Sequence, residues 1–72
     1  MDAYEKLANA IILQAVKDYR SSLKILKRRP DSIPANSTKD EIERFFRSGW
    51  YQLLTELDGE MLIRRLQEEA GI

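Results

Sequence analysis

The residues that come nearest to a metal-binding pattern are two acidic side chains around a glycine. Asp58 and Glu60 flank Gly59, as in a calcium loop, but the other oxygen ligands of a D-x-D-x-D-G pattern are absent. The sequence also has no Cys and no His, so it lacks thiolate ligands, thiol nucleophiles and the commonest general base. We therefore expect no metal, no cofactor and no enzymatic activity, and interpret Asp58 as a helix cap.

Other acidic residues are close enough in sequence to be considered as acid and base pairs. They are Glu41 with Glu43 and Glu68 with Glu69. Side chains at adjacent or alternate helical positions point apart, so we interpret both pairs as surface charge. Asp18 lies at the edge of an apolar helical face, where partial burial would require a cation, and we expect it to pair with Arg44 or Arg47.

Basic side chains are predicted to follow one solvent-facing strip of the first helix. They are Lys17, Arg20, Lys24, Lys27 and Arg28. Such a strip could contact phosphates, because Lys and Arg supply most of the non-specific affinity for nucleic acid. The net charge is zero, however, and no recognition helix rich in Arg, Asn or Gln is evident. Nucleic-acid binding is therefore our alternative to a solvated face with cations near a helix C-terminus.

Apolar periodicity predicts an all-α protein with three helices, in which two longer helices form an antiparallel pair and a short C-terminal helix closes one end. The prolines at 30 and 34 predict the loop, and Ser37 or Thr38 is expected to cap the second helix. Gly71 is expected to end the third. The expected single domain comprises a helix at about 3–27, a loop at 28–37 and helices at about 38–57 and 60–70.

The second predicted helix carries most of the aromatic residues. Phe45, Phe46 and Trp50 share one helical face with Leu53 and Leu57, so we predict that Trp50 is buried in the core. Whether this helix is continuous or kinked near residues 48–49 is left open, because glycine is unfavourable in a helix interior. The absence of a side chain at residue 49 predicts close approach of another helix there.

Some apolar side chains fall outside the predicted core faces. They are Leu13, Tyr51, Leu54 and Met61. Scattered exposed apolar residues are normal in monomers, but this number in a 72-residue chain favours a partner surface. Small domains without disulfides or metals often oligomerise. We therefore expect a non-enzymatic protein–protein interaction or accessory module that self-associates, with a dimer as the expected form.

Several blocks of the sequence together resemble a known group of proteins. These are AIILQAVKDYR at 10–20, FFRSGWY at 45–51, LT at 54–55 and LDGE at 57–60. The pattern is similar to small uncharacterised proteins encoded in prophages and conjugative elements of Firmicute-type bacteria. The resemblance implies a bacterial, mobile-element context and no particular activity. Since no stretch approaches the ~20 apolar residues of a membrane span, we expect a cytoplasmic location.

Overall fold

The computed structural model describes residues 3–72, and these residues form four α-helices. The helices are α1 (Ala3–Arg28), α2 (Ile33–Phe46), α3 (Gly49–Leu54) and α4 (Gly59–Ala70). The described part of the chain contains no strand, so the predicted all-α class is confirmed. The second predicted helix is divided into α2 and α3 at the position near residues 48–49 where a kink was left open, so the described residues form four helices, of which α3 has only six residues.

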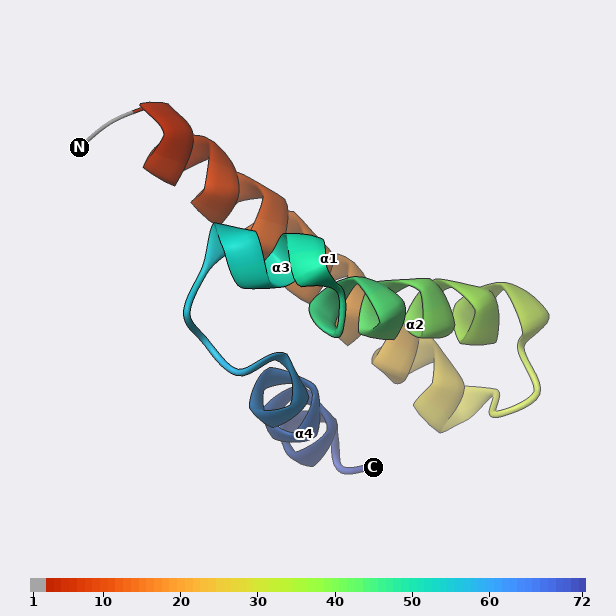
Figure 1. The fold of residues 1–72 in the computed structure, drawn as a ribbon. Coiled ribbons are helices and arrows are strands. Elements are labelled where there is room, and N and C mark those ends of the chain that lie inside the picture. The colour runs from red at the N-terminus through yellow and green to blue at the C-terminus, as the bar shows by residue number, and fades with distance from the viewer. Residues whose placement is uncertain (1–2) are drawn as a thin grey trace.

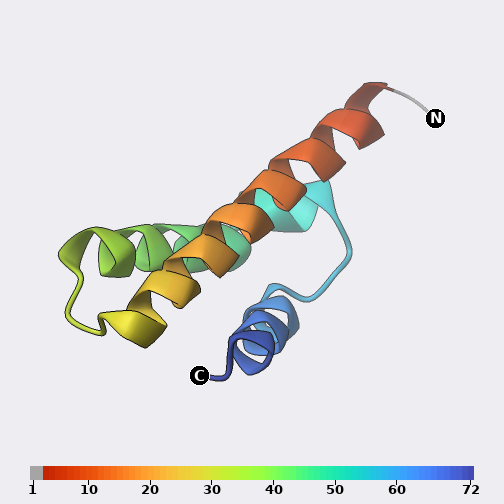
Figure 2. The ribbon, with the colours of Figure 1, turned by 180° about the vertical axis from the view of Figure 1, so that it is seen from behind.

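Helix α1 sets the length of the molecule. Its 26 residues extend ~39 Å at the usual helical rise, nearly the whole of the 41 Å longest dimension. Figures 1 and 2 show that α2 folds back across the C-terminal half of α1, while α3 lies beside the N-terminal half. The first turns of α1 extend beyond the other helices in both views.

Helix α2 begins earlier than predicted. Ser32 is its N-cap and accepts a hydrogen bond from the backbone N–H of Ala35 at 3.4 Å. Pro34 lies in the first turn, where its missing N–H would have had no helical partner. The expected cap at Ser37 or Thr38 is therefore wrong, because the proline starts the helix instead of excluding it, and the loop is only residues 29–32.

Two residues, Arg47 and Ser48, separate α2 from α3, and Ser48 is extended. Ser48 has φ −79° and ψ 158°, accepts a hydrogen bond from the Tyr51 N–H at 3.1 Å and donates one to the Phe45 carbonyl at 2.6 Å. This extended residue changes the rotational phase of α3 relative to α2. As a result Trp50, predicted to be buried, is 56% exposed, whereas Tyr51, predicted for a partner surface, is 1% exposed.

The hydrophobic core combines side chains from all four helices. Its rings meet mostly edge to face, with the centroid of Phe46 5.9 Å from that of Tyr19 and 5.6 Å from that of Tyr51. Leu53 and Leu57, which the single helical phase had assigned to the buried face, are exposed. The core residues are Ile12, Tyr19, Leu23, Phe46, Tyr51, Ile63 and Leu66.

The close backbone approach occurs at Gly59 and not at Gly49 as expected. A Cβ atom on Gly59 would lie 2.0 Å from the carbonyl oxygen of Phe46, whereas one on Gly49 would meet nothing within 4 Å. Asp58 caps α4 through its Oδ1, which accepts from the N–H groups of Glu60 and Met61 at 3.0 and 3.4 Å. The start of α4 therefore packs directly against the end of α2.

The two glycines should respond oppositely to alanine. Gly59→Ala forces α4 away from the Phe46 carbonyl, and we expect the free energy of unfolding to fall by about 1–3 kcal/mol or more, as for other overpacked sites. Gly49→Ala enters open space in a helix, and we expect a change between zero and a stabilisation of about 1 kcal/mol. Urea denaturation of both variants measures the difference. Equal effects would contradict the close approach at Gly59.

Candidate functional site

The predicted partner surface of four apolar residues is only partly present. Leu13 and Met61 are exposed, at 63% and 58%. Leu54 is half-buried and packs on the core, and Tyr51 belongs to the core itself. The predicted exposure of Tyr51 and Leu54 is therefore wrong, because both were placed by the phase of an uninterrupted helix. The structure shows a different apolar surface nearby.

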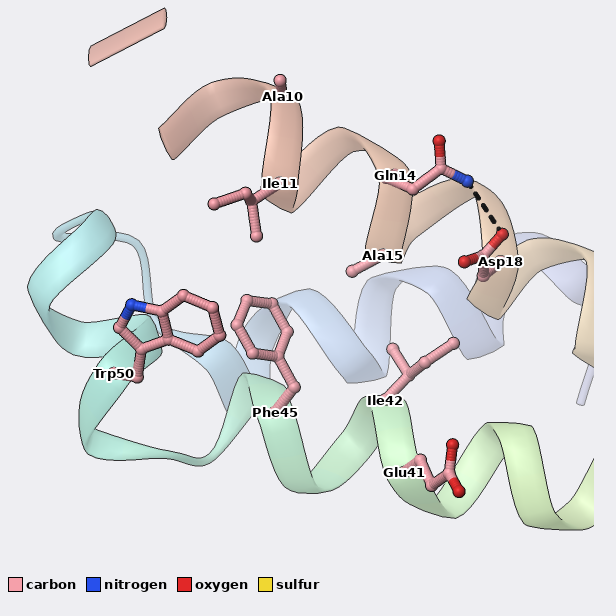
Figure 3. A pocket seen from close by; sticks show the side chains of 9 residues that line it. All are labelled: Ala10, Ile11, Gln14, Ala15, Asp18, Glu41, Ile42, Phe45 and Trp50. Carbon is pink, nitrogen blue, oxygen red and sulfur yellow. Dashed lines mark hydrogen bonds between the residues drawn. The ribbon is translucent and has the colours of Figure 1, made fainter. Parts of the chain in front are cut away.

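This surface is a groove between α1 and the segment formed by α2 and α3, with a volume of about 480 Å³. Figure 3 shows the side chains of α1 on one side and those of α2 and α3 on the other. Clefts of roughly 300–1,000 Å³ are typical of binding sites, so this one can accept several side chains. Its lining residues are Ala10, Ile11, Gln14, Ala15, Asp18, Glu41, Ile42, Phe45 and Trp50.

Aromatic side chains form one end of the groove. The rings of Phe45 and Trp50 meet nearly edge to face, with centroids 5.6 Å apart and an interplanar angle of 74°. In Figure 3 the indole lies beside the Phe45 ring, and Ile11 points from α1 toward both. Phe45 is half-buried, whereas Trp50 is mostly exposed. The indole therefore keeps much of its apolar surface available to another molecule.

The charged side chains that line the groove are both acidic. Asp18 accepts a hydrogen bond from the Gln14 amide at 3.0 Å. The predicted pairing of Asp18 with Arg44 or Arg47 is wrong, because Arg47 instead contacts Glu43 and Glu60. Among residues 3–72, neither Asp18 nor Glu41 forms an ion pair. The groove thus presents uncompensated negative charge beside an apolar floor.

A buried polar network lies within the helix packing, apart from the groove lining. Glu43, expected to be surface charge, is only 9% exposed. The Tyr19 hydroxyl donates a hydrogen bond to the Glu43 carboxylate at 2.6 Å and accepts one from the Gln67 amide of α4 at 3.2 Å. Lys39 and Arg47, at i−4 and i+4, lie 2.8 and 3.6 Å from the carboxylate oxygens. That spacing of cations signals ion pairs along one helix, but it does not signal the burial of Glu43.

The network shifts the pKa of both interacting side chains. Burial disfavours the charged form of Glu43 and is the largest single effect, but the hydrogen bonds and charges from Lys39, Tyr19 and Arg47 outweigh it, so the pKa of Glu43 is lowered. Burial, and then the hydrogen bond to Glu43, raise the pKa of Tyr19. The pair is therefore a neutral phenol donating to an ionised carboxylate at neutral pH.

The basic strip of α1 is exposed as predicted. All five of its members are on the surface, and Arg20 forms an ion pair with Glu69 of α4 at 3.1 Å. The other four have no ion pair within the described residues. They are Lys17, Lys24, Lys27 and Arg28. The structure therefore leaves these cations available to solvent or to a ligand.

Removing the Glu43 carboxylate should destabilise the fold. In Glu43→Gln the two cations lose the negative charge that they pair with, and we expect the free energy of unfolding at pH 7 to fall by about 1.5–3 kcal/mol, as for hydrogen bonds to charged groups. A lowered folded-state pKa stabilises the protein above the unfolded-state value of about 4.3. This contribution is lost as the pH falls through the folded-state pKa.

Urea denaturation from pH 7 to pH 2 measures this prediction. The stability difference between the native chain and Glu43→Gln should be constant near neutrality and shrink at acid pH. Glu41→Gln is the matched control, because Glu41 is exposed and unpaired within residues 3–72, and we expect a change within ~0.5 kcal/mol. An equal loss of stability in both variants would contradict the buried network.

Residues 3–72 contain neither a cluster of metal-ligating side chains nor a membrane-spanning helix. No three acidic side chains converge as metal ligands there. None of their helices has both the length and the hydropathy needed to span a bilayer. Comparison of the sequence with protein-family models, with curated proteins and with solved structures gives no match.

Proposed function

We propose that this chain is a non-enzymatic interaction module that binds a helix of another polypeptide in the groove between α1 and α2–α3. The observation that carries the proposal is Trp50, the single tryptophan, which stands 56% exposed at the end of an apolar groove. Tryptophan is enriched among the residues that dominate binding energy at interfaces. Amphipathic helices commonly dock in grooves of this kind.

The distribution of polar groups supports binding in preference to catalysis. The buried carboxylate, Glu43, is neutralised by Lys39 and Arg47 and does not line the groove. The acidic groups that do line it, Asp18 and Glu41, are exposed to solvent. The groove therefore offers anchoring surface and charge.

The cellular context is proposed from the residue blocks alone. The blocks at 10–20 and 45–51, which carry the resemblance to prophage and conjugative-element proteins, include groove residues such as Ile11, Phe45 and Trp50. We propose that the module acts in the bacterial cytoplasm as an accessory protein of a mobile element. In that role it would hold or position another protein.

The groove can be tested with helical peptides selected from a display library. We expect binders that shift the emission of Trp50 to shorter wavelength as the indole becomes buried. Trp50→Ala should weaken their binding by more than tenfold, the loss of at least ~1.4 kcal/mol, while leaving the free energy of unfolding within ~0.5 kcal/mol because the indole is exposed. Fluorescence anisotropy measures the affinities.

Leu53→Ala is the matched control for Trp50→Ala. Leu53 is on the same helix and is 76% exposed, but it does not line the groove. We expect its replacement to leave peptide affinity within twofold. Equal losses for the two variants, or peptides that bind without any change in Trp50 emission, would overturn the groove as the binding site.

Nucleic-acid binding by the basic strip is the alternative function. The supporting observation is that Lys17, Lys24, Lys27 and Arg28 are exposed and lack ion pairs within residues 3–72. A strip of cations along one helix can follow phosphates. It ranks second because Glu69 already neutralises Arg20, and the chain has no excess of positive charge.

Salt dependence separates the two functions. We expect no sub-micromolar affinity for generic duplex DNA at physiological ionic strength. The alternative instead requires affinity that falls with salt, with a slope near −0.9 per neutralised phosphate. Lys17→Gln with Lys24→Gln would then reduce that slope by about 1.8. Arg64→Gln with Arg65→Gln, exposed on α4, is the control of equal charge. Tight binding lost only in the first variant would establish the alternative.

A further inference from the structure

We propose that the helix bound in the groove is α1 of a second copy, arranged antiparallel about a two-fold axis near Ile11. This inference rests on the proposed function, because it identifies the partner of the same groove. It requires that one face of the chain carry both the groove and the side chains that fill it, since a two-fold interface is self-complementary. Three observations support a second copy as the partner.

The first observation is the area that the single chain leaves exposed. Its accessible surface is 5469 Å² for a mass of 8.4 kDa. A folded monomer of that mass is expected to expose ~4,600 Å². The excess is close to the ~800 Å² that each partner buries in an interface of standard size. A second copy on this face would therefore bring the exposed area to that of a compact domain.

The second observation is that apolar side chains continue from the groove onto the projecting end of α1. Leu7 and Tyr4 are each 59% exposed and lie one and two helical turns, respectively, before Ile11. The spacing of residues 4, 7 and 11 places them on one side of the helix, the side that faces the groove. Only α3 lies beside this part of α1 in Figures 1 and 2.

The same spacing makes the face self-complementary. In an antiparallel pair of α1 helices with the axis at Ile11, Leu7 of each copy lies opposite Ala15 of the other. Ala15 is small, half-buried and part of the groove lining, so it leaves room for the leucine. Leu7 of each copy therefore packs on Ala15 in the groove of the other copy, and this contact occurs twice in each dimer.

The third observation is charge. The acidic end of the groove, at Asp18 and Glu41, has no cation of its own chain within the described residues. In the antiparallel arrangement the acidic ends of the two copies lie apart, at opposite ends of the pair of α1 helices. A parallel arrangement would instead bring the two copies of Asp18 together. Electrostatics therefore favours the antiparallel orientation.

Sedimentation and cysteine cross-linking test the arrangement. At roughly tens of micromolar, within a common range for small homodimers, we expect the native chain to sediment as a dimer. Because the sequence has no Cys, each introduced thiol is unique. Ile11→Cys should form a disulfide with its own copy under mild oxidation, since residues on the axis meet the required Cα separation of about 4.4–6.8 Å. Leu13→Cys, exposed on another side of α1, is the control and should remain largely monomeric.

A mixed experiment fixes the orientation. Leu7→Cys and Ala15→Cys chains should form a mixed disulfide in preference to either self-linked product. A Leu7→Cys chain that links only to itself overturns the antiparallel arrangement. A native chain that is monomeric at millimolar concentration overturns the second copy as occupant, while the groove still binds selected peptides if the proposed function holds. Loss of both peptide binding and dimerisation would overturn both proposals.

Discussion

The hydrogen bond from the Tyr19 hydroxyl to the Glu43 carboxylate, 2.6 Å long, is the interaction on which the packing of α1, α2 and α4 depends. A charged group removed from water is tolerated only when its partners are complete. Here those partners come from different helices, because Gln67 of α4 donates to the Tyr19 oxygen, while Lys39 of α2 and Arg47, which caps its C-terminus, neutralise the charge. Sliding any helix along another would leave a buried polar group unpaired. We therefore infer that this network sets the helix register, while the aromatic rings around it supply most of the apolar burial.

The sequence predicted α1 and α4 closely because each has a regular apolar stripe and an end signal, such as Asp58 before α4 and Gly71 after it, where φ is 78°. It failed between Phe46 and Tyr51, because helical phase can be extended only through continuous helix. One extended residue, Ser48, turned the next side chains to new directions. The exposure of the basic strip was predictable, because its residues lie on the side of α1 away from the apolar stripe. The groove was not, since it arises from the placement of α1 beside α2 and α3, which no local pattern encodes.

The break at Ser48 also links folding to binding. The rotation that directs Tyr51 into the core leaves the preceding Trp50 outside it, in contact with Phe45 at the groove. Two adjacent aromatic residues therefore have separate roles, one in stability and one at the surface. A tryptophan held on the surface gains little from folding of its own chain. Its position at the end of an apolar groove is the observation behind the partner that we propose, which is why the groove and not the basic strip leads our proposal.

The projecting start of α1 affects the local stability of the helix and the affinity of any molecule that binds there. Residues 3–7 are all exposed, so their helical hydrogen bonds receive little support from tertiary packing. We expect these turns to fray, and their amide protons to exchange with solvent much faster than those around Tyr19. A molecule that docks there must order these helical turns, and the conformational entropy lost in that ordering weakens its affinity. Affinity would then depend on helix propensity at positions outside the interface. An exposed, weakly helix-forming residue such as Asn9 could adjust binding without touching the partner.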